Sequence, residues 1–302
     1  MLNRNPFHPD GVFLLMQQIM VETEPDVSLN VILRNEAPVR FVMVHGLASN
    51  ARLYDGVAET LAEWGYGSIA IDLRGHGQSS KPSTGYDHAT ISRDLYAAIT
   101  ALHDEVSDYP AVWLGQSWGA AVVSEFALRN PNLVGSLILI DGGLVDLKWE
   151  FPDWQSCKER LTPPDLSRTS GAELETWMRN SHPDWSDLAI AGSLANMEFA
   201  DDNTVRPRLS RQHHMEILEE LYRYTPLTIL TQIQVPIRFL LADRANSPFI
   251  AQRERAISAL NGRPNATFEI FENSDHDLHA QHPRRVATIA RDVLLAMTGV
   301  TN

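Results

Sequence analysis

The chain has 302 residues, of which 44% are hydrophobic, so it is long enough to bury one large core. Its 25 lysines and arginines stand against 38 aspartates and glutamates, and a net charge of −13 without a basic stripe argues against nucleic acid or an anionic membrane surface as a partner. No apolar run reaches the roughly 18 residues that a membrane-spanning helix needs. The single cysteine, Cys157, has no partner for an internal disulfide. We therefore expect a soluble, cytoplasmic protein with no membrane or nucleic-acid partner.

Apolar runs and periodicity predict the secondary structure in chain order. Two early strands, which we expect to pair antiparallel, are predicted at 27–33 and 41–44, and further strands at 68–71, 111–114, 137–140, 237–241 and 266–271. The central runs are apolar on both faces, which is typical of parallel strands covered by helices on each side. Helical patterns are predicted over 51–64, 120–129, 249–260 and 284–297.

The pentapeptide Gly115–Gly119 reads Gly-Gln-Ser-Trp-Gly and lies between the predicted strand at 111–114 and the predicted helix at 120–129. This sequence of strand, sharp turn and helix is the context in which the serine of G-x-S-x-G acts as a nucleophile. Only glycine, which lacks a Cβ, fits on either side of the serine where strand and helix nearly touch. The pattern also arises by chance, so Ser117 needs catalytic partners elsewhere in the chain.

Candidate partners for Ser117 lie on loops that follow other predicted strands. A serine hydroxyl is a weak nucleophile at neutral pH and needs a histidine base and a carboxylate that orients this base. His276 lies on the loop after the strand at 266–271 and is well placed to be the base. The turn His45-Gly46 after the strand at 41–44 can direct a backbone N–H toward the serine. The chain therefore has candidates in the order serine, acid, histidine.

These landmarks resemble those of the α/β-hydrolase fold enzymes, a large group of serine hydrolases that includes esterases, lactonases, proline iminopeptidases and carbon–carbon bond hydrolases. The family's order is followed over most of the chain by four landmarks: His45-Gly46, the segment Asp72–Ser79, the Ser117 turn, and His276 with Pro283 seven residues on. In the family, the segment like Asp72–Ser79 is a structural loop that ties neighbouring loops together. We interpret it here as structural and not catalytic.

The resemblance implies a mostly parallel, doubly wound sheet with an inserted helical cap. Residues 1–142 and 229–302 would form the core domain, and residues 143–228 would form the cap. The insertion contains Trp149, Trp154, Trp177 and Trp185 together with Phe151, Met178, Leu188, Ile190, Leu194, Met197 and Phe199. We expect the inner face of this cap to form an apolar roof above Ser117. For any single tryptophan, a place in the cap's own small core or at its seam with the sheet is the preferred interpretation.

The resemblance also implies roles for single residues. The oxyanion hole would consist of the backbone N–H groups of Leu47 and Trp118. His276 is preferred as the base over His279 and His282, because its spacing from the proline that opens the last helix is the family's usual one. The glycine that usually precedes this histidine is replaced here by Asp275.

Two aspartates remain candidates for the acid. Asp243 follows the predicted strand at 237–241, at the end of a strand where open α/β sheets build their sites, although the family's more frequent Gly-x-x-Asp pattern is absent. Asp141 ends the strand at 137–140, the other strand from which some relatives supply the acid. The sequence favours Asp243 over Asp141, and each could instead cap a turn.

Three functions remain open for this chain. The leading hypothesis is a serine hydrolase that cleaves a small, mostly apolar carboxylic ester or lactone through an acyl-enzyme at Ser117. The second is a proline-iminopeptidase-like peptidase or a carbon–carbon bond hydrolase, for which Glu150, Asp153 and Glu198 offer acidic cap residues. The third is a catalytically silent ligand receptor of the same fold. No cofactor or metal is expected, because the neighbouring His213 and His214 have no third ligand at a metal-like spacing.

Overall fold

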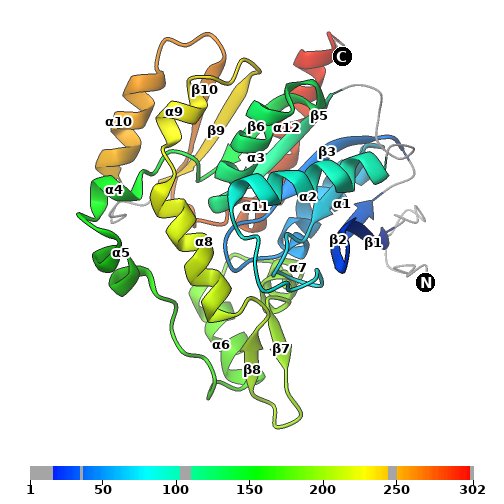
Figure 1. Ribbon diagram of the computed structural model, residues 1–302. Coiled ribbons are helices and arrows are strands. Elements are labelled where there is room, and N and C mark those ends of the chain that lie inside the picture. The colour runs from blue at the N-terminus through cyan, green and yellow to red at the C-terminus, as the bar shows by residue number, and fades with distance from the viewer. Residues whose placement is uncertain (1–15, 35–36, 103–109, 244–249, 300–302) are drawn as a thin grey trace.

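The computed structural model describes residues 16–34, 37–102, 110–243 and 250–299 (Figure 1). Their main feature is an eight-stranded sheet in the order β1-β2-β4-β3-β5-β6-β9-β10. The strands are β1 (Met16–Glu24), β2 (Val27–Arg34), β3 (Val39–Val44), β4 (Gly67–Ile71), β5 (Ala111–Gln116), β6 (Val134–Ile140), β9 (Ile237–Ala242) and β10 (Ala266–Phe271). β1 and β2 run antiparallel to their neighbours. The other six strands of this sheet, β3, β4, β5, β6, β9 and β10, are parallel to one another. The predicted, mostly parallel sheet is therefore confirmed.

The expected antiparallel pair of strands at 27–33 and 41–44 is wrong. β2 pairs instead with β1 on one side and with β4 on the other, and β3 lies between β4 and β5. A short turn at Asp26, which has a φ of 65°, joins β1 and β2 into a hairpin. A helical crossover then brings β4 back parallel to β3, so β4 occupies the edge at which β2 was expected.

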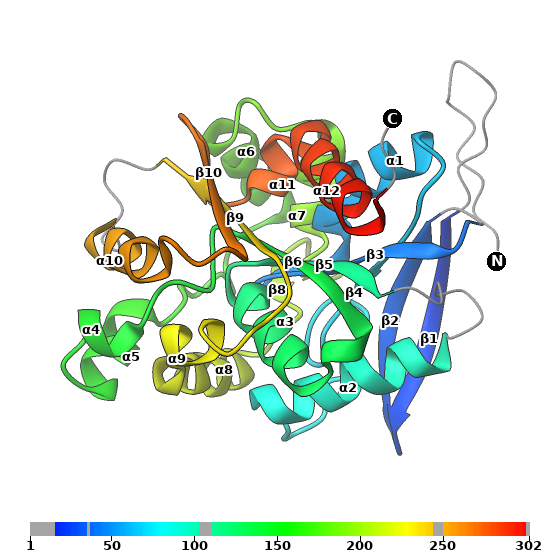
Figure 2. The ribbon, with the colours of Figure 1, turned by 90° about the horizontal axis from the view of Figure 1, so that it is seen from above.

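Helices cover both faces of the sheet, as Figure 2 shows. On one face lie α1 (Asp55–Glu63), which follows the short helix η1 (Ala51–Tyr54), and α12 (Pro283–Thr298), which follows α11 (Leu278–Gln281). On the other face lie α2 (His88–Ala101), α3 (Trp118–Arg129), which precedes η2 (Pro131–Leu133), and α10 (Ile250–Leu260). Phe41 and Met43 of β3 pack toward α1 and α12, whereas Val42 and Val44 pack toward α2 and α3. Strands that are apolar on both faces are therefore explained by burial on both sides.

A long insertion separates β6 from β9, although these two strands are hydrogen-bonded neighbours. It contains α4 (Leu147–Glu150), α5 (Trp154–Leu161), α6 (Gly171–Ser181), α7 (Asp187–Leu194), β7 (Met197–Phe199), β8 (Val205–Pro207), α8 (Arg211–Arg223) and α9 (Pro226–Leu230). Side-chain caps define several helix starts, including a capping box between Ser170 and Glu173 at α6. Figure 1 shows α6, β7 and β8 together at the bottom of the view.

Two small apolar clusters contain most of the buried side chains of the helices α4 to α7, together with Leu218 of α8. One combines Leu174, Met178 and Trp185 with Leu53 of η1 and Ala280 of α11, so it joins the insertion to the rest of the fold. The other contains Leu147, Leu218 and the buried Cys157. Burial raises the pKa of the Cys157 thiol to about 11, which leaves it protonated and unreactive at neutral pH.

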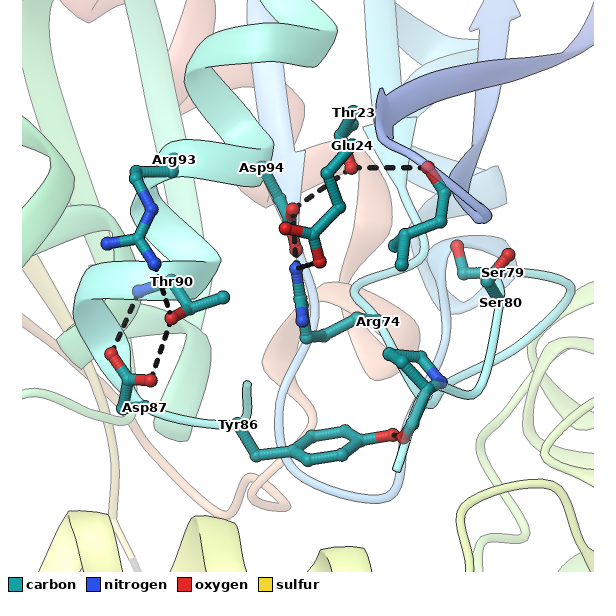
Figure 3. A network of polar contacts seen from close by, with 12 residues as sticks. Thr23, Glu24, Arg74, Ser79, Ser80, Tyr86, Asp87, Thr90, Arg93 and Asp94 are labelled. Atoms are coloured by element: carbon teal, nitrogen blue, oxygen red, sulfur yellow. Dashed lines mark hydrogen bonds and ion pairs between the residues drawn. The ribbon is translucent and has the colours of Figure 1, made fainter. Parts of the chain in front are cut away.

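The loop Asp72–Ser79 is fixed by a buried ion pair. Arg74 is 2% exposed, and its Nε and Nη2 donate to the two carboxylate oxygens of Asp94 on α2 at 2.5 and 2.7 Å. Its Nη2 also donates to Glu24 of β1 at 2.9 Å, and Thr23 donates to Asp94 at 3.0 Å (Figure 3). The buried guanidinium thus forms a bidentate pair with one carboxylate and a further bond to a second, and these bonds position the loop, α2 and β1 relative to one another. This geometry supports a structural role for the loop.

Among the described residues, no helix is long and apolar enough to cross a membrane. In the same part of the chain, no three histidine, cysteine, aspartate or glutamate side chains are grouped so that they could hold a metal ion.

Candidate active site

Ser117 occupies a strained turn between β5 and α3. Its backbone has φ 53° and ψ −117°, a conformation that L-residues rarely adopt and that must be enforced by the surrounding structure. Two hydrogen bonds enforce it: the Ser117 N–H donates to the carbonyl of Ile140 on β6 at 2.9 Å, and the Ala120 N–H donates to the Ser117 carbonyl at 3.1 Å. The turn therefore holds Ser117 at the end of β5, beside the end of β6.

The two glycines of the pentapeptide are required by close backbone contacts. A Cβ added to Gly115 would lie 2.4 Å from the carbonyl oxygen of Gly119, and one added to Gly119 would lie 2.4 Å from the carbonyl oxygen of His45. Real Cβ atoms do not approach other atoms this closely. The expectation that only glycine fits beside Ser117 is confirmed by these distances.

Two further glycines bring other loops against the serine. A Cβ added to Gly142 would lie 2.2 Å from the Ser117 carbonyl oxygen. One added to Gly46 would lie 2.2 Å from the Gln116 side-chain oxygen and 3.1 Å from the Ser117 Cβ. Leu47, which follows Gly46, is thus next to the nucleophile turn. Trp118 is the first residue of α3, so its N–H has no intrahelical acceptor.

Two buried histidines, for which the sequence suggested no role, hold the Leu47 loop. The Nε2 of His45 accepts from the Leu73 N–H at 3.0 Å, and the Nε2 of His76 accepts from the Ala48 N–H at 3.2 Å. Their Nδ1 atoms lie 2.7 and 3.0 Å from backbone carbonyls, so each ring is neutral with its proton on Nδ1. Burial lowers the pKa of both histidines, which keeps this arrangement intact at neutral pH.

His276 is hydrogen-bonded to a buried aspartate at the end of β6. The Nδ1 of His276 lies 2.7 Å from the Oδ2 of Asp141, whose side chain is only 5% exposed. The other Asp141 oxygen accepts from the Ala242 N–H at 3.1 Å, and the Asp141 N–H donates to the Leu240 carbonyl at 2.7 Å. With a φ of 40°, the Asp141 backbone is itself strained. Asp141 is therefore held between β6 and β9 and oriented toward His276.

Of the two candidate acids, this contact favours Asp141 over Asp243. Asp243 lies one residue beyond β9 and is exposed, and its N–H donates to the Phe271 carbonyl at 2.9 Å. The carboxylate that meets the His276 ring is that of Asp141, which the sequence ranked second. Asp141 and Asp243 each lie one residue beyond neighbouring parallel strands, so their places along the strands do not distinguish them, whereas the contact with His276 does. The rest of the loop in which the acid was expected, residues 244–248, lies outside the described residues, as does residue 249 of the expected helix.

The two other histidines near the C-terminus face different surroundings. His279 is fully buried against the ring of Tyr54, with ring centroids 4.3 Å apart, and burial lowers its pKa to about 3. His282 contacts the Ser274 hydroxyl through its Nε2 at 2.9 Å. Of the three histidines, His276 lines the cavity at Ser117.

A cavity of about 280 Å³ joins Ser117, Asp141 and His276. Its other walls are mainly apolar: Trp118, Ala121, Gly142, Gly143, Leu144, Val145, Leu147, Leu161, Leu218, Leu221, Tyr224 and Leu241, with Arg253 as the cationic residue. Leu161 ends α5, and Leu218 and Leu221 belong to α8, so the insertion supplies the roof. Burial raises the pKa of Tyr224, so this phenol is neutral.

The tryptophans of the insertion do not form this roof. None of the four lines the cavity among the described residues. Trp149 and Trp177 are 58% and 60% exposed, Trp154 packs near Tyr222, and Trp185 is buried in the cluster around Leu174. The apolar roof exists, but it consists of leucines because the α8 face with leucines three residues apart lies over Ser117.

Comparisons with known proteins agree with this architecture. A family model described as "Serine aminopeptidase, S33" matches residues 36–282. The chain is 34% identical over 268 residues to Lipase LipV of Mycobacterium tuberculosis, and this match covers 85% of the chain and 94% of the lipase. It is 33% identical over 100 residues to a putative non-heme haloperoxidase of Mycobacterium phage D29, a match covering 33% of the chain and 34% of that relative. The chain thus matches only about a third of the length of the phage protein.

Solved structures share the fold at low sequence identity. The structure of E-2-(acetamidomethylene)succinate hydrolase matches with a TM-score of 0.76 at 20% identity, covering 92% of this chain and 99% of that one. The structure of Est816, an N-acyl homoserine lactone degrading enzyme, matches with a TM-score of 0.67 at 18% identity, covering 91% and 99%. At these identities, the likeness establishes the fold alone.

Proposed function

Because the chain belongs to the α/β-hydrolase family, we propose that it is a serine hydrolase that cleaves small, mostly apolar carboxylic esters or lactones. The observation that carries this proposal is the hydrogen bond of 2.7 Å between His276 and Asp141 in the same cavity as the strained Ser117. A serine, a histidine and a buried carboxylate that meet in one cavity form the minimum equipment for nucleophilic catalysis.

The reaction would begin when the Ser117 hydroxyl attacks the substrate carbonyl. In the neutral His276 ring, Nδ1–H donates to Asp141, which leaves the Nε2 lone pair to take the serine proton. The carboxylate of Asp141 stabilises the imidazolium that forms. The N–H groups of Trp118 and Leu47 would bind the negatively charged oxygen of the tetrahedral intermediate. His276 then gives its proton to the leaving alkoxide, and a water molecule, activated by the same ring, releases the acid from Ser117.

The walls of the cavity support an apolar substrate. Leu144, Leu147 and Leu161 lie on its sides together with Leu218 and Leu221 of α8. Apolar walls strengthen the binding of a substrate with each carbon atom that it buries against them. A cavity of about 280 Å³ limits the number of such carbon atoms. The names of the lipase and of the lactone-degrading enzyme are consistent with an ester or a lactone.

A peptidase is the second candidate, favoured by the name of the matching family model. Recognition of a free amino terminus calls for a carboxylate at the cavity. Of the three acidic residues suggested for this purpose, Asp153 caps α5, Glu150 accepts from Gln252 and Glu198 pairs with Arg208, and none lines the cavity among the described residues. The ester reading therefore has more support. A silent ligand receptor is the weakest reading, because serine, histidine and acid are all present.

A fluorophosphonate probe tests the proposed chemistry, because it reacts covalently with an activated serine. We expect labelling at Ser117 and turnover of p-nitrophenyl esters, both of which Ser117→Ala abolishes while thermal unfolding stays nearly unchanged. Ser124→Ala is the matched control, since Ser124 lies on α3, the helix that follows Ser117, and its hydroxyl donates to the Ala120 carbonyl. A fully active Ser117→Ala protein would refute the proposal. Cleavage of free prolyl amides but not of neutral esters would select the peptidase instead.

A further inference from the structure

The residue before His276 connects its loop to the insertion. The Asp275 carboxylate Oδ2 lies 2.8 Å from Nδ1 of His182 and accepts from the Trp185 Nε1 at 3.2 Å. His182 is the C-cap residue of α6, and Trp185 belongs to the turn that leads into α7. Two side chains of the insertion thus meet on one oxygen of the residue adjacent to the proposed base.

The two donors of the insertion are held rigidly. The rings of His182 and Trp185 are stacked, with centroids 4.1 Å apart. The backbone N–H of Trp185 donates to the backbone carbonyl of His182 at 3.1 Å. Trp185 is buried among apolar residues of the insertion, η1 and α11. Both donors therefore keep a fixed direction toward Asp275.

The part of the insertion that carries these donors is also anchored to the segment around Asn50 and η1, outside the insertion. Asn50 donates through Nδ2 to the Gly192 carbonyl at the end of α7 at 2.8 Å. A Cβ on Gly192 would lie 2.8 Å from the Arg52 carbonyl oxygen, so α7 lies directly against η1. The contact at Asp275 consequently ties the His276 loop to a fixed point.

The opposite side of the loop is held by the C-terminal helices. The Asp275 N–H donates to the Gln281 side chain at 2.6 Å, and the Ser274 hydroxyl contacts His282 at 2.9 Å. The hydrogen bond to Asp141 fixes the rotation of the His276 ring, but it does not fix where the loop backbone lies. The contacts on Asp275 supply that second constraint.

We propose that Asp275, held by His182 and Trp185, is a positioning residue that couples the seating of the insertion to the placement of His276 above Ser117. This proposal rests on the proposed function of His276 as the base. A displacement of the base by about 1 Å can cost on the order of 10²-fold in rate.

We call the contact of Asp275 with His182 and Trp185 the Asp275 clamp. Steady-state kinetics on a neutral ester tests its role. Asp275→Ala is expected to lower kcat about 10- to 100-fold with KM within about twofold, because it displaces the base and leaves the substrate cavity intact. Asp275→Asn keeps an oxygen that accepts from both donors and is expected to stay within about threefold. Trp185→Phe keeps the stacked ring, removes one donor, and is expected to give a smaller loss of about threefold to tenfold.

Two controls separate positioning from a merely structural role. Asp202→Ala removes an aspartate of the same insertion that accepts from Thr204 in an exposed turn, and it should leave kcat unchanged. The double variant of His182→Ala and Asp275→Ala should be no slower than Asp275→Ala alone, because both changes break the same contact. Losses that multiply would count against the clamp.

The labelling rate distinguishes failure of this inference from failure of the proposed function. Labelling of Ser117 by the fluorophosphonate requires the base but little of the cavity. Slower labelling of Asp275→Ala, with Asp275→Asn close to wild type, supports the clamp. If wild-type Ser117 is labelled and Asp275→Ala matches it in labelling rate and kcat, the clamp is refuted and the triad stands. If wild-type Ser117 is not labelled at all, the proposed function fails, and this inference fails with it.

Discussion

The Asp141 carboxylate lies 2.7 Å from Nδ1 of His276, although 135 residues separate the two in the chain. Asp141 follows β6, and His276 lies on the loop after β10, two strands away in the sheet. Because parallel strands end at the same edge of the sheet, both loops reach the cavity that Ser117 lines. We infer from this contact that Asp141, and not Asp243, is the acid that orients His276.

The choice of acid can be tested with two amide substitutions. Asp141→Asn should lower kcat on an ester by roughly 10⁴-fold, because an amide cannot stabilise the imidazolium that forms during attack. Asp243→Asn, at an exposed position, is the matched control and should stay close to wild type. Thermal unfolding of both variants verifies that they are folded. A severe loss in Asp243→Asn alone would restore the acid that the sequence favoured.

The choice of base can be tested by comparing two histidines. His276→Ala should reduce turnover about as strongly as Ser117→Ala, because members of a triad act as a unit. His279→Phe should have a mild effect, since His279 is buried against Tyr54 and does not line the cavity among the described residues. The measurement is kcat at saturating ester. Loss of activity in His279→Phe, with retention in His276→Ala, would contradict the assignment.

Burial of His279 predicts an acid-sensitive fold. Its pKa falls to about 3 in the folded protein from an ordinary value of 6.5, so below pH 6.5 the unfolded chain binds a proton that the folded protein does not. The free energy of unfolding should therefore fall as the pH drops from 7 to 5. The contribution of His279 to this fall is about 1.4 kcal/mol for each pH unit below 6.5.

Urea unfolding at pH 7 and pH 5 checks this prediction. His279→Phe removes the titrating ring and keeps the contact with Tyr54, so its loss of stability between the two pH values should be smaller by about 2 kcal/mol. His45 and His76, whose pKa is also lowered, are present in both proteins and cancel in the comparison. The same pH dependence in both proteins would contradict burial of a neutral His279.

The leucine roof predicts the substrate preference. The kcat/KM of straight-chain esters should rise about fourfold per added methylene until the cavity is full, as expected for roughly 0.8 kcal/mol per buried CH₂. Leu221→Phe should narrow the cavity and shift the preferred chain to a shorter one. Trp177→Ala is the control, because Trp177 is 60% exposed and lies away from the cavity. An effect of Trp177→Ala in place of Leu221→Phe would favour the tryptophan roof.

The sequence by itself was sufficient for the elements whose signals are local. The turn around Ser117 is encoded within residues 111–129 by an apolar strand, two glycines and a helix. The backbone contacts at Gly115 and Gly119 give the physical reason for that spacing. Runs that are apolar on both faces likewise predicted a mostly parallel sheet covered on each side. His276 was identified as the candidate base from its place after β10 and its spacing from Pro283.

The remaining features were decided by tertiary structure, because they depend on which distant segments become neighbours. The place of β4 between β2 and β3 results from a crossover that no local pattern encodes. The preference for Asp141 depends on its strained backbone and on its hydrogen bond with His276. Leucines of α8, not tryptophans, line the cavity because helix packing determines which face of the insertion lies over Ser117. Hydrophobicity alone encodes burial, but it does not encode the partner against which a side chain is buried.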